Sequence, residues 1–295
     1  AVNPRVGREY AIRDLPDEKK ENPKNVLVVG GGCAGLEAAR RAAFAGHKVI
    51  VCESKGYLGG QLRLAAMMPE RQEIADIIPW DERQLNKLGV EIRLNTTVDE
   101  KLIDELKPDV IVLAAGSVCE VPLGYIQGLD NVRDIQLEVV DELLEEGRPT
   151  GDNVLIIGGD QIGLQLADYL SEQGKRIYVT EKSSHWAEKM AANDRFYLIG
   201  RLIEKGVKRY KNVYGVEIMP TEEVSIESAK GRERLPHVDT IVLASERRPN
   251  ISLAEVVERK GIDMHIVGDA SGVEGSDRGT VFAAIAAGYD TGRLI

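Results

Sequence analysis

The chain has 295 residues, of which 43% are hydrophobic and 29% charged, and its formal net charge at pH 7 is −10. This length holds one large domain or two of ordinary size, and the acidic balance argues against nucleic acid or an anionic membrane surface as a partner. No apolar run approaches the roughly 18 residues of a membrane helix, and the first twenty residues hold no apolar signal core, so we expect a cytoplasmic protein.

The first predicted unit is a βαβ unit from Asn25 to Glu53, NVLVVGGGCAGLEAARRAAFAGHKVIVCE. An apolar run ends in a turn with Gly30, Gly32 and Gly35, and a helix and a second apolar run follow. In a G-x-G-x-x-G turn the first glycine permits the tight bend, the second leaves room for a pyrophosphate at the helix N-terminus, and the third lets helix and strand pack closely. Glu53 lies 18 residues beyond Gly35, close to the spacing of a carboxylate that binds the adenosine ribose. This complete copy predicts a dinucleotide site.

Further elements of the same unit follow Glu53. A helical pattern covers Ile74 to Leu88, and short strands are expected near Val90–Leu94 and Asp109–Leu113. The last strand runs into the small residues AAGS, which suits a buried strand that ends against a ligand. The segment EVPLGYIQGLDN, which begins at Glu120, has the proline and glycines of a crossing into another unit.

The segment Asn153–Glu181, NVLIIGGDQIGLQLADYLSEQGKRIYVTE, repeats the first βαβ unit without a gap at an offset of 128, with 11 identities in 29 positions. Gly158 and Gly163 take the places of the first and third glycines, and Glu181 is again the terminal acid. Asp160 stands where the second glycine is expected. Strand, turn, helix, strand and acid repeated in order are stronger evidence than a lone glycine motif.

Asp160 leaves two interpretations of the second unit open. Two charges about 4 Å apart interact by roughly 1 kcal/mol in water and about 4 kcal/mol at an effective dielectric of 20, so a carboxylate that faced a pyrophosphate would weaken its binding. Asp160 would avoid this by turning toward solvent, Arg247 or Arg248. Glu181 suits the free 2′-hydroxyl of NAD and disfavours the phosphate of NADP. The sequence therefore predicts the fold of a second module, which is either a working NAD site or a relic of one.

The remaining chain completes both units. The late strand DTIVLASERRPN, Asp239–Asn250, belongs to the second unit, and HIVGDASG, His265–Gly272, returns the chain to the first with a small-residue helix behind it. We therefore predict an α/β fold of two Rossmann-like dinucleotide-binding domains, one inserted in the other. The expected boundaries are 24–128 and 256–295 for the first domain and 129–255 for the inserted one.

Cysteine and histidine form no metal or catalytic pattern in this sequence. The three cysteines, Cys33, Cys52 and Cys119, include no CxxC pair, and the four histidines are scattered. Zinc sites and redox dithiols need ligands at short, regular spacings. We therefore expect structural thiols, no metal site and no side-chain nucleophile.

Six motifs in this order resemble the two-dinucleotide-binding flavoprotein reductases: GGGCAGLEAA, CES, GGQL, VLAAGS, RRPN and GDASG. In that superfamily an FAD module is interrupted by an NAD(P)H module, and the resemblance covers almost the whole chain from Lys24 onward. Thioredoxin reductases of the superfamily carry a redox CxxC in the nicotinamide module. This chain has none, so disulfide reduction is not expected.

The opening VNPRVGRE is similar to a segment of the 2,4-dienoyl-CoA reductase, enoate reductase and trimethylamine dehydrogenase family. There it joins an iron–sulfur-binding linker to the FAD module. The resemblance implies that residues 1–23 are a linker segment and that the chain is the C-terminal half of a longer enzyme. The implied partner is an N-terminal FMN/[4Fe–4S] barrel.

The resemblance also assigns FAD contacts residue by residue. It implies contacts with the pyrophosphate at Gly30, Gly32, Ala34 and Gly35, and contacts around the adenosine ribose at Glu53 and Ser54. Gly60, Gln61 and Leu62 would flank the middle of the cofactor, and Val98 would meet the adenine through its backbone. Ala114, Ala115 and Gly116 would line the crossing, and Gly268, Asp269 and Val281 would lie on the flavin side. For NADH it implies Gly158, Gln161, Ile162, Gly163 and Glu181. Asp160 departs from the pattern, and so does Glu246, where relatives usually carry a glycine.

Two functions from different classes follow. The first is an FAD-dependent oxidoreductase module that accepts hydride from NADH and passes electrons to the barrel; the cofactors carry the chemistry, so no catalytic side chain is expected. The second is a scaffold that holds ADP in place of FAD, as in trimethylamine dehydrogenase-like relatives, with a degenerate nicotinamide site. A free-standing reductase of the ferredoxin or rubredoxin type is a third, weaker reading. The sequence does not predict the substrate of the parent enzyme or the oligomeric state.

Overall fold

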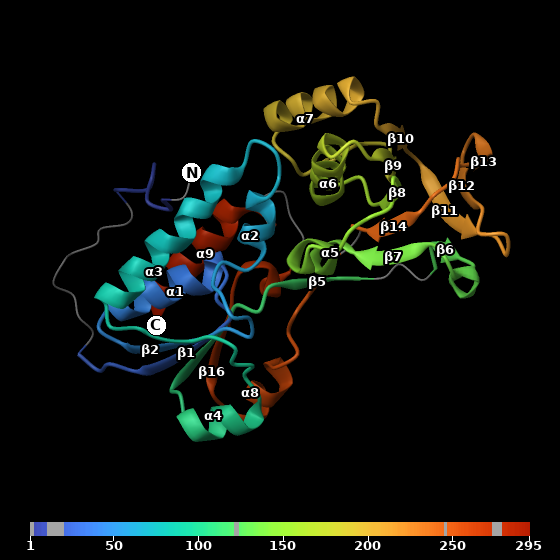
Figure 1. The fold of residues 1–295 in the computed structure, drawn as a ribbon. Helices are drawn as coiled ribbons and strands as arrows, with labels where there is room; N and C mark the ends of the chain where they lie inside the picture. The colour runs from blue at the N-terminus through green and yellow to red at the C-terminus, as the bar shows by residue number, and fades with distance from the viewer. Residues whose placement is uncertain (1–2, 11–20, 121–123, 245–246, 273–278) are drawn as a thin grey trace. The chain divides into compact units, whose positions relative to one another are not determined.

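The computed structural model describes residues 3–10, 21–120, 124–244, 247–272 and 279–295, and the chain divides into two compact units (Figure 1). Unit 1 consists of Ala1–Ala65, Glu73–Val118 and Arg248–Ile295. Unit 2 consists of Ala66–Gln72 and Cys119–Arg247. Each unit has its own parallel sheet and its own core, which confirms the predicted fold class.

The sheet of unit 1 is five-stranded and parallel, in the order β16-β4-β1-β2-β3. Its strands in chain order are β1 (Asn25–Val29), β2 (Lys48–Cys52), β3 (Glu91–Arg93), β4 (Val110–Leu113) and β16 (Asp263–Ile266). The central strands are runs of Val, Ile and Leu because helices cover both faces of the sheet. Val26 and Val28 point into one core and Leu27 and Val29 into the other, as the two-residue period of a strand requires.

Helices from both ends of the chain form the layer on the first face of this sheet. They are α1 (Cys33–Phe44), α3 (Ile77–Lys87) and α9 (Val281–Leu294), and the short α2 (Gln61–Ala66) and the 3₁₀ turn η1 (Gln72–Asp76) connect β2 to α3. A Cβ on Gly288 of α9 would overlap the carbonyl oxygen of Ala34, and one on Gly292 would meet Ala38. The small residues of α9 are therefore needed for its close packing on α1. On the other face lie α4 (Glu100–Leu106) and α8 (Ala254–Lys260).

Unit 2 repeats this plan in a parallel sheet of order β10-β9-β8-β14-β7. Its strands are β7 (Gln136–Val139), β8 (Asn153–Ile157), β9 (Arg176–Thr180), β10 (Lys208–Tyr210) and β14 (Thr240–Leu243), and its helices are α5 (Val140–Glu146), α6 (Gln161–Glu172) and α7 (Ala192–Glu204). Asn153 pairs with Arg176 as Asn25 pairs with Lys48. The two strand pairs therefore have the same register at the offset of 128 residues.

A second, four-stranded sheet in unit 2 was not predicted. It has the order β13-β12-β11-β6, with β6 (Ile126–Gln127), β11 (Val213–Ile218), β12 (Val224–Ser228) and β13 (Gly231–Arg234). The 3₁₀ turn η2 (Leu129–Asn131) follows β6, and β5 (Ser117–Cys119) pairs with β15 (Arg247–Pro249) where the chain crosses between units.

The chain changes units at other places than the expected boundaries 128/129 and 255/256. It enters unit 2 after Val118, because β6 pairs with β11 of that unit. It leaves unit 2 after Arg247, because α8 packs into the core of unit 1 through Ala254 and Val257. The sequence also gave no sign that Ala66–Gln72 belongs to unit 2.

Candidate functional site

The turn between β1 and α1 contains the three glycines of the first motif, and their surroundings differ. Gly30 has φ of +108°, and a Cβ there would overlap the carbonyl oxygen of Ala114. A Cβ on Gly35 would overlap the carbonyl oxygen of Gly30. Gly32 is the N-cap of α1 in an extended conformation, with φ −79° and ψ 176°, and a Cβ there would meet nothing within 4 Å. Gly32 therefore leaves open space at the N-terminus of α1, where helix amides and the helix dipole generally favour an anion.

Glu53 is fixed beside this turn by backbone amides. Its side chain is buried, at 8% relative exposure, and Oε2 accepts a hydrogen bond of 2.7 Å from the Gly31 amide. Oε1 accepts from the Lys55 amide at 2.8 Å and from the exposed Ser54 hydroxyl at 3.1 Å. The carboxylate is thus held at the carboxyl end of β2, where the sequence predicted a ribose contact.

The GGQL segment lies directly against the glycine turn. The Gly59 amide donates to the Gly31 carbonyl at 2.8 Å, and a Cβ on Gly60 would lie 3.3 Å from the Cα of Gly32. Gln61 begins α2. Leu62 is 4% exposed and belongs to the core of unit 1, so its side chain is a packing residue.

Three segments to which the resemblance assigns cofactor contacts meet at the hydroxyl of Ser117. Ser117 is buried; its Oγ accepts from Gln61 Nε2 at 3.3 Å and donates to Asp269 Oδ2 at 3.2 Å. Asp269 lies in the 3₁₀ turn η3 (Gly268–Ser271). Ser117 is the last residue of the segment AAGS, but only the folded chain brings it between Gln61 and Asp269.

Several of the remaining predicted residues of unit 1 lie against the same turn or the start of α1. Ala114 packs on Gly30 and Gly35, followed by Ala115 and by Gly116 with φ of +71°, and a Cβ on Gly268 would lie 2.8 Å from that of Ala34. Val281 is the first residue of α9, whose N-cap Thr280 accepts from the Ala283 amide at 3.1 Å. The side chain of Val98 is buried in the second core, which leaves its backbone for the adenine contact that the resemblance implies.

The turn of the second unit has the same backbone with a different side chain. Gly158 has φ of +117°, and a Cβ on Gly163 would overlap its carbonyl oxygen. Asp160 is the N-cap of α6 with φ −80° and ψ −174°, close to the conformation of Gly32. Its side chain is exposed, and within the described ranges no hydrogen bond or ion pair of its carboxylate is found. Gln161 and Ile162 follow at the start of α6, half-buried.

Of the directions that the sequence left open for the Asp160 side chain, namely solvent, Arg247 or Arg248, the structure shows the exposed one. Arg247 forms a two-pronged ion pair with Asp141, at 3.0 and 2.7 Å, so its guanidinium is directed to α5. Glu246 lies outside the described residues. Glu181 repeats the geometry of Glu53, because Oε2 accepts from the Gly159 amide and Oε1 from the Ser183 amide, each at 2.7 Å.

The duplication extends past these acids into a third strand, which sequence comparison at one offset missed. The Thr96 amide donates to the Glu53 carbonyl at 2.8 Å, and the Val213 amide donates to the Glu181 carbonyl at 3.0 Å. Asn95 and Asn212 precede them with φ of +51° and +53°. These pairs are 117 residues apart, and the same offset aligns Gly89-Val90 with Gly206-Val207. It matches Val213–Gly215 to Thr96–Val98, so unit 2 has a counterpart of the predicted adenine-facing segment.

The cysteine in the first turn is not poised for chemistry. Burial, and next the Asp81 carboxyl, raise the pKa of the Cys33 thiol to about 12. The thiol therefore stays protonated at neutral pH, as expected for a structural cysteine. Among the described residues, no group of three or more His, Cys, Asp or Glu is placed to hold a metal ion, and no helix is long and apolar enough to cross a bilayer.

The chain is similar to known proteins over nearly its full length. Residues 24–284 match the family described as pyridine nucleotide-disulphide oxidoreductase. NADH oxidase of Thermoanaerobacter brockii is 33% identical over 98% of this chain and 43% of its own length. Bilirubin reductase of Mediterraneibacter gnavus is 32% identical over 92% of this chain and 41% of its own.

A solved 2-naphthoyl-CoA reductase complex has the same fold, with a TM-score of 0.88 and 32% identity, over 99% of this chain and 43% of that one. The chain thus spans less than half the length of the relatives that it matches. The family match confirms the membership that the motifs indicated, and the chain belongs to the pyridine nucleotide-disulphide oxidoreductase family.

Proposed function

We propose that this chain is an FAD-dependent oxidoreductase module that takes reducing equivalents from NADH and passes electrons to an iron–sulfur/FMN barrel of a longer parent protein. Family membership and two copies of a dinucleotide-binding unit in one chain support the proposal. The names of its relatives, NADH oxidase, bilirubin reductase and 2-naphthoyl-CoA reductase, support a redox role.

Gly32 is the observation that carries the proposal. Gly30 and Gly35 are glycines because neighbouring carbonyl groups leave no room for a side chain, whereas a Cβ on Gly32 would meet nothing within 4 Å. Packing inside unit 1 therefore does not explain a glycine at position 32. The close approach of an outside group to the backbone explains it, and the diphosphate of FAD at the N-terminus of a twelve-residue helix is such a group.

Other residues of unit 1 fit the same cofactor. The Glu53 carboxylate, fixed by the Gly31 and Lys55 amides, would accept hydrogen bonds from the adenosine ribose. Asp269, which accepts from Ser117, would accept from the ribityl hydroxyls. The N-terminus of α9 carries the partial positive charge of its dipole, which would stabilise the reduced ring. When bound, FAD would supply the redox chemistry, accepting hydride from NADH and releasing electrons to the next carrier.

For unit 2 we propose NADH rather than NADPH. The Glu181 carboxylate is held in place by two amides at 2.7 Å and would repel a 2′-phosphate while accepting from a free 2′-hydroxyl. The segment Val213–Gly215 would face the adenine. Asp160 would weaken the binding of the diphosphate, because its exposed carboxylate borders the amides of α6.

The barrel partner is proposed from the length of the relatives and from the sequence resemblance. More than half of each of the three similar proteins lies outside the match. The segment VNPRVGRE resembles the joint between an iron–sulfur linker and an FAD module. The substrate reduced by the parent enzyme would then be bound by the barrel.

An anaerobic absorption spectrum tests the module. The purified chain is incubated with FAD, freed of excess cofactor, and measured before and after addition of NADH. We expect a yellow protein that NADH bleaches and that then reduces an artificial dye. A protein that stays colourless after incubation with FAD contradicts the flavin site, and retained flavin that NADH does not bleach contradicts the NADH site alone.

Asp160 favours a second candidate function, a scaffold that holds ADP in unit 1. An acid in place of the glycine would persist in unit 2 if no nicotinamide coenzyme had to bind there. A colourless protein that releases ADP on denaturation would support the scaffold. Release of FAD on denaturation would rule it out.

A further inference from the structure

Trp186 lies against the glycine turn of unit 2. A Cβ on Gly159 would overlap Cζ3 of the Trp186 ring and would lie 2.7 Å from the Cβ of Glu181. The ring therefore rests on the backbone of the turn. It lies beside the side chain whose carboxylate accepts from the Gly159 amide at 2.7 Å. Trp186 thus borders both the turn and the terminal acid of the second βαβ unit.

The duplication gives Trp186 a counterpart, Leu58, at the offset of 128. Leu58 also packs on its own turn, since a Cβ on Gly31 would lie 2.7 Å from Cδ2 of Leu58. Leu58 is 6% exposed and belongs to the core of unit 1, whereas Trp186 remains partly exposed. A leucine is enough to fill the space beside such a turn, so packing within the unit does not explain the larger ring.

The backbone after Trp186 is held in place at a conformational cost. The Ala187 amide donates to the Gly159 carbonyl at 3.0 Å. Ala187 has φ of +41°, a region in which a residue with a side chain is strained. Its counterpart in unit 1 is Gly59, with φ of +109°. Unit 2 therefore keeps the indole beside the turn without a glycine to relieve the strain, and strain of this kind is concentrated at functional sites.

The polar edge of the indole is directed away from the turn. Cζ3 and Cε3 lie nearest to Gly159, and in an indole ring these two atoms lie on the side opposite to Nε1. Along the described parts of the chain, no hydrogen bond of the Trp186 N–H is found. A tryptophan that presents an apolar face and a donor is typical of surfaces that bind another molecule.

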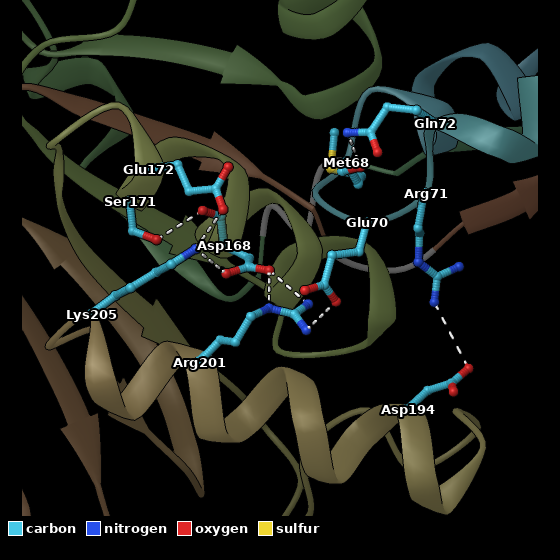
Figure 2. A network of polar contacts seen from close by, with 10 residues as sticks. All are labelled: Met68, Glu70, Arg71, Gln72, Asp168, Ser171, Glu172, Asp194, Arg201 and Lys205. Carbon is cyan, nitrogen blue, oxygen red and sulfur yellow. Dashed lines mark hydrogen bonds and ion pairs between the residues drawn. The ribbon is translucent and has the colours of Figure 1, made fainter.

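The helix that begins at Asp160 is anchored within unit 2. Asp168 of α6 is 1% exposed, and its carboxylate pairs with Arg201 at 2.8 Å and with Lys205 at 2.7 Å (Figure 2). Lys205, the C-cap of α7, also pairs with Glu172 at 3.0 Å. Separation of a buried ion pair leaves a charge uncompensated. A shift of α6 that moved the Asp160 carboxylate away from a phosphate would therefore be costly.

We propose that unit 2 recognises its ligand by the adenosine half, through the Trp186 ring and the Glu181 carboxylate, and gains little from the diphosphate. This role of Trp186 rests on the proposed function of unit 2 as a nucleotide site. Unit 1 has the opposite balance, because Gly32 leaves open space at the N-terminus of α1 while Leu58 is buried. In unit 2 the Asp160 carboxylate opposes the phosphates, and the partly exposed indole supplies apolar contact instead.

Tryptophan fluorescence of the full chain tests this balance. The chain has two tryptophans, and Trp80→Phe removes the one in α3 of unit 1, so the remaining emission comes from Trp186. We expect adenosine and ADP each to change this emission, with dissociation constants within about threefold of each other. Asp160→Gly in the same chain should tighten ADP binding by at least about fivefold and leave adenosine binding unchanged.

Trp186→Leu places the residue of unit 1 in unit 2, and isothermal titration measures the result. Adenosine binding to unit 2 should weaken about twofold to tenfold, the range for loss of one aromatic contact. Trp186→Phe should restore part of the affinity. Trp80→Leu is the matched control and should leave the adenosine titration unchanged. A thermal melt of each chain shows whether the substitution alters the fold.

The outcomes distinguish this inference from the oxidoreductase proposal. ADP that binds to unit 2 more than about tenfold tighter than adenosine would overturn it, because the phosphates would then carry the binding. Unchanged adenosine affinity in a folded Trp186→Leu chain would overturn it as well. If the Trp186 emission responds to adenosine but NADH does not bleach the flavin-loaded chain, the redox proposal fails and the adenosine site stands. If neither ligand changes the emission, both proposals for unit 2 fail.

Discussion

Gly32 and Asp160 stand at the same point of two copies of one turn, with φ of −79° and −80°. Space inside the unit permits either residue, since a Cβ on Gly32 meets nothing within 4 Å. The difference between them therefore concerns what approaches from outside. On the proposed function, the same backbone with hydrogen or a carboxylate would give one turn that admits an anion and one that repels it.

Gly32→Asp should accordingly weaken cofactor binding without loss of stability. A carboxylate about 4 Å from the diphosphate costs roughly 1 to 4 kcal/mol, depending on the effective dielectric, so the dissociation constant of FAD should rise about fivefold to a thousandfold. The measurement is a flavin fluorescence titration beside a thermal melt.

Gly35→Ala is the contrasting variant for that experiment. Its Cβ would overlap the Gly30 carbonyl, so the thermal midpoint should fall, with an overpacking cost of about 1–3 kcal/mol. If Gly32→Asp melted early instead, or kept the affinity of the parent chain, the distinction between the two glycines would be wrong.

Asp81 predicts a pH dependence of the stability of unit 1. Burial, and next the Glu37 carboxylate, raise the pKa of Asp81 to about 7 from its ordinary 3.8. Between these values the native chain keeps a proton that the unfolded chain has lost, so the free energy of unfolding contributed by Asp81 is largest near pH 4 and falls as pH rises to about 7. The full effect is on the order of 4 kcal/mol, at about 1.4 kcal/mol per pH unit.

Asp81→Asn removes the titration of Asp81 and leaves the other carboxylates in place. The difference in stability between the two chains therefore reports Asp81 alone. Urea unfolding of both chains at pH 4.5 and 7.5 should show the parent chain losing stability relative to the variant as pH rises. Parallel changes in the two chains would mean that Asp81 titrates normally. Glu37 and Arg40, which face it from α1, are left intact in both.

At the scale of elements, the sequence predicted the strands that a local residue pattern determines. β1, β4, β8 and β14 were expected because buried parallel strands are continuous apolar runs. The hairpin of β12 and β13 was missed because all four residues of β13 are exposed and polar or glycine. The segment Ala66–Gln72 was not expected to belong to unit 2, because its Glu70 pairs with Arg201, which is 131 residues away in the sequence.

Two helix glycines make a matched test of how α9 packs. Gly288→Ala places a Cβ against the Ala34 carbonyl, whereas a Cβ on Gly200 of α7 meets nothing within 4 Å. We expect Gly288→Ala to lower the free energy of unfolding by about 1–3 kcal/mol and Gly200→Ala to raise it by up to about 1 kcal/mol. Urea titrations of both variants decide the point; equal effects would show that α9 does not need its glycine for contact with α1.

For the whole molecule, duplication gave more information than any single motif. One gapless offset revealed the glycine turns and the acids Glu53 and Glu181, which the structure places in equivalent hydrogen bonds. The third strand was not found because unit 1 has additional residues between Gly59 and Gly89, which shift the offset from 128 to 117. Ser117 escaped because its role depends on Gln61 and Asp269, which only the folded chain brings to it.

Two copies of one site in one molecule should bind their common ligand unequally. ADP is the half that FAD and NADH share, so isothermal titration of the chain with ADP should reveal a tight site in unit 1 and a weaker one in unit 2. The difference between the two dissociation constants arises from Asp160 and should be at least about fivefold, which is the effect of one exposed charge at about 4 Å. Because the side chain is exposed, raising the salt from about 0.05 to 0.5 M should narrow the gap by screening.

Single substitutions show which unit contains the tight ADP site and which contains the weak one. Gly32→Asp should weaken the tight site in unit 1, and Asp160→Gly should strengthen the weak site in unit 2. A second site that stays absent in the Asp160→Gly chain would show that unit 2 has lost more than its glycine, since Glu181 and the Gly159 amide keep the geometry of Glu53 and Gly31. In that case the nicotinamide site is a relic, and the electrons must enter the parent protein elsewhere.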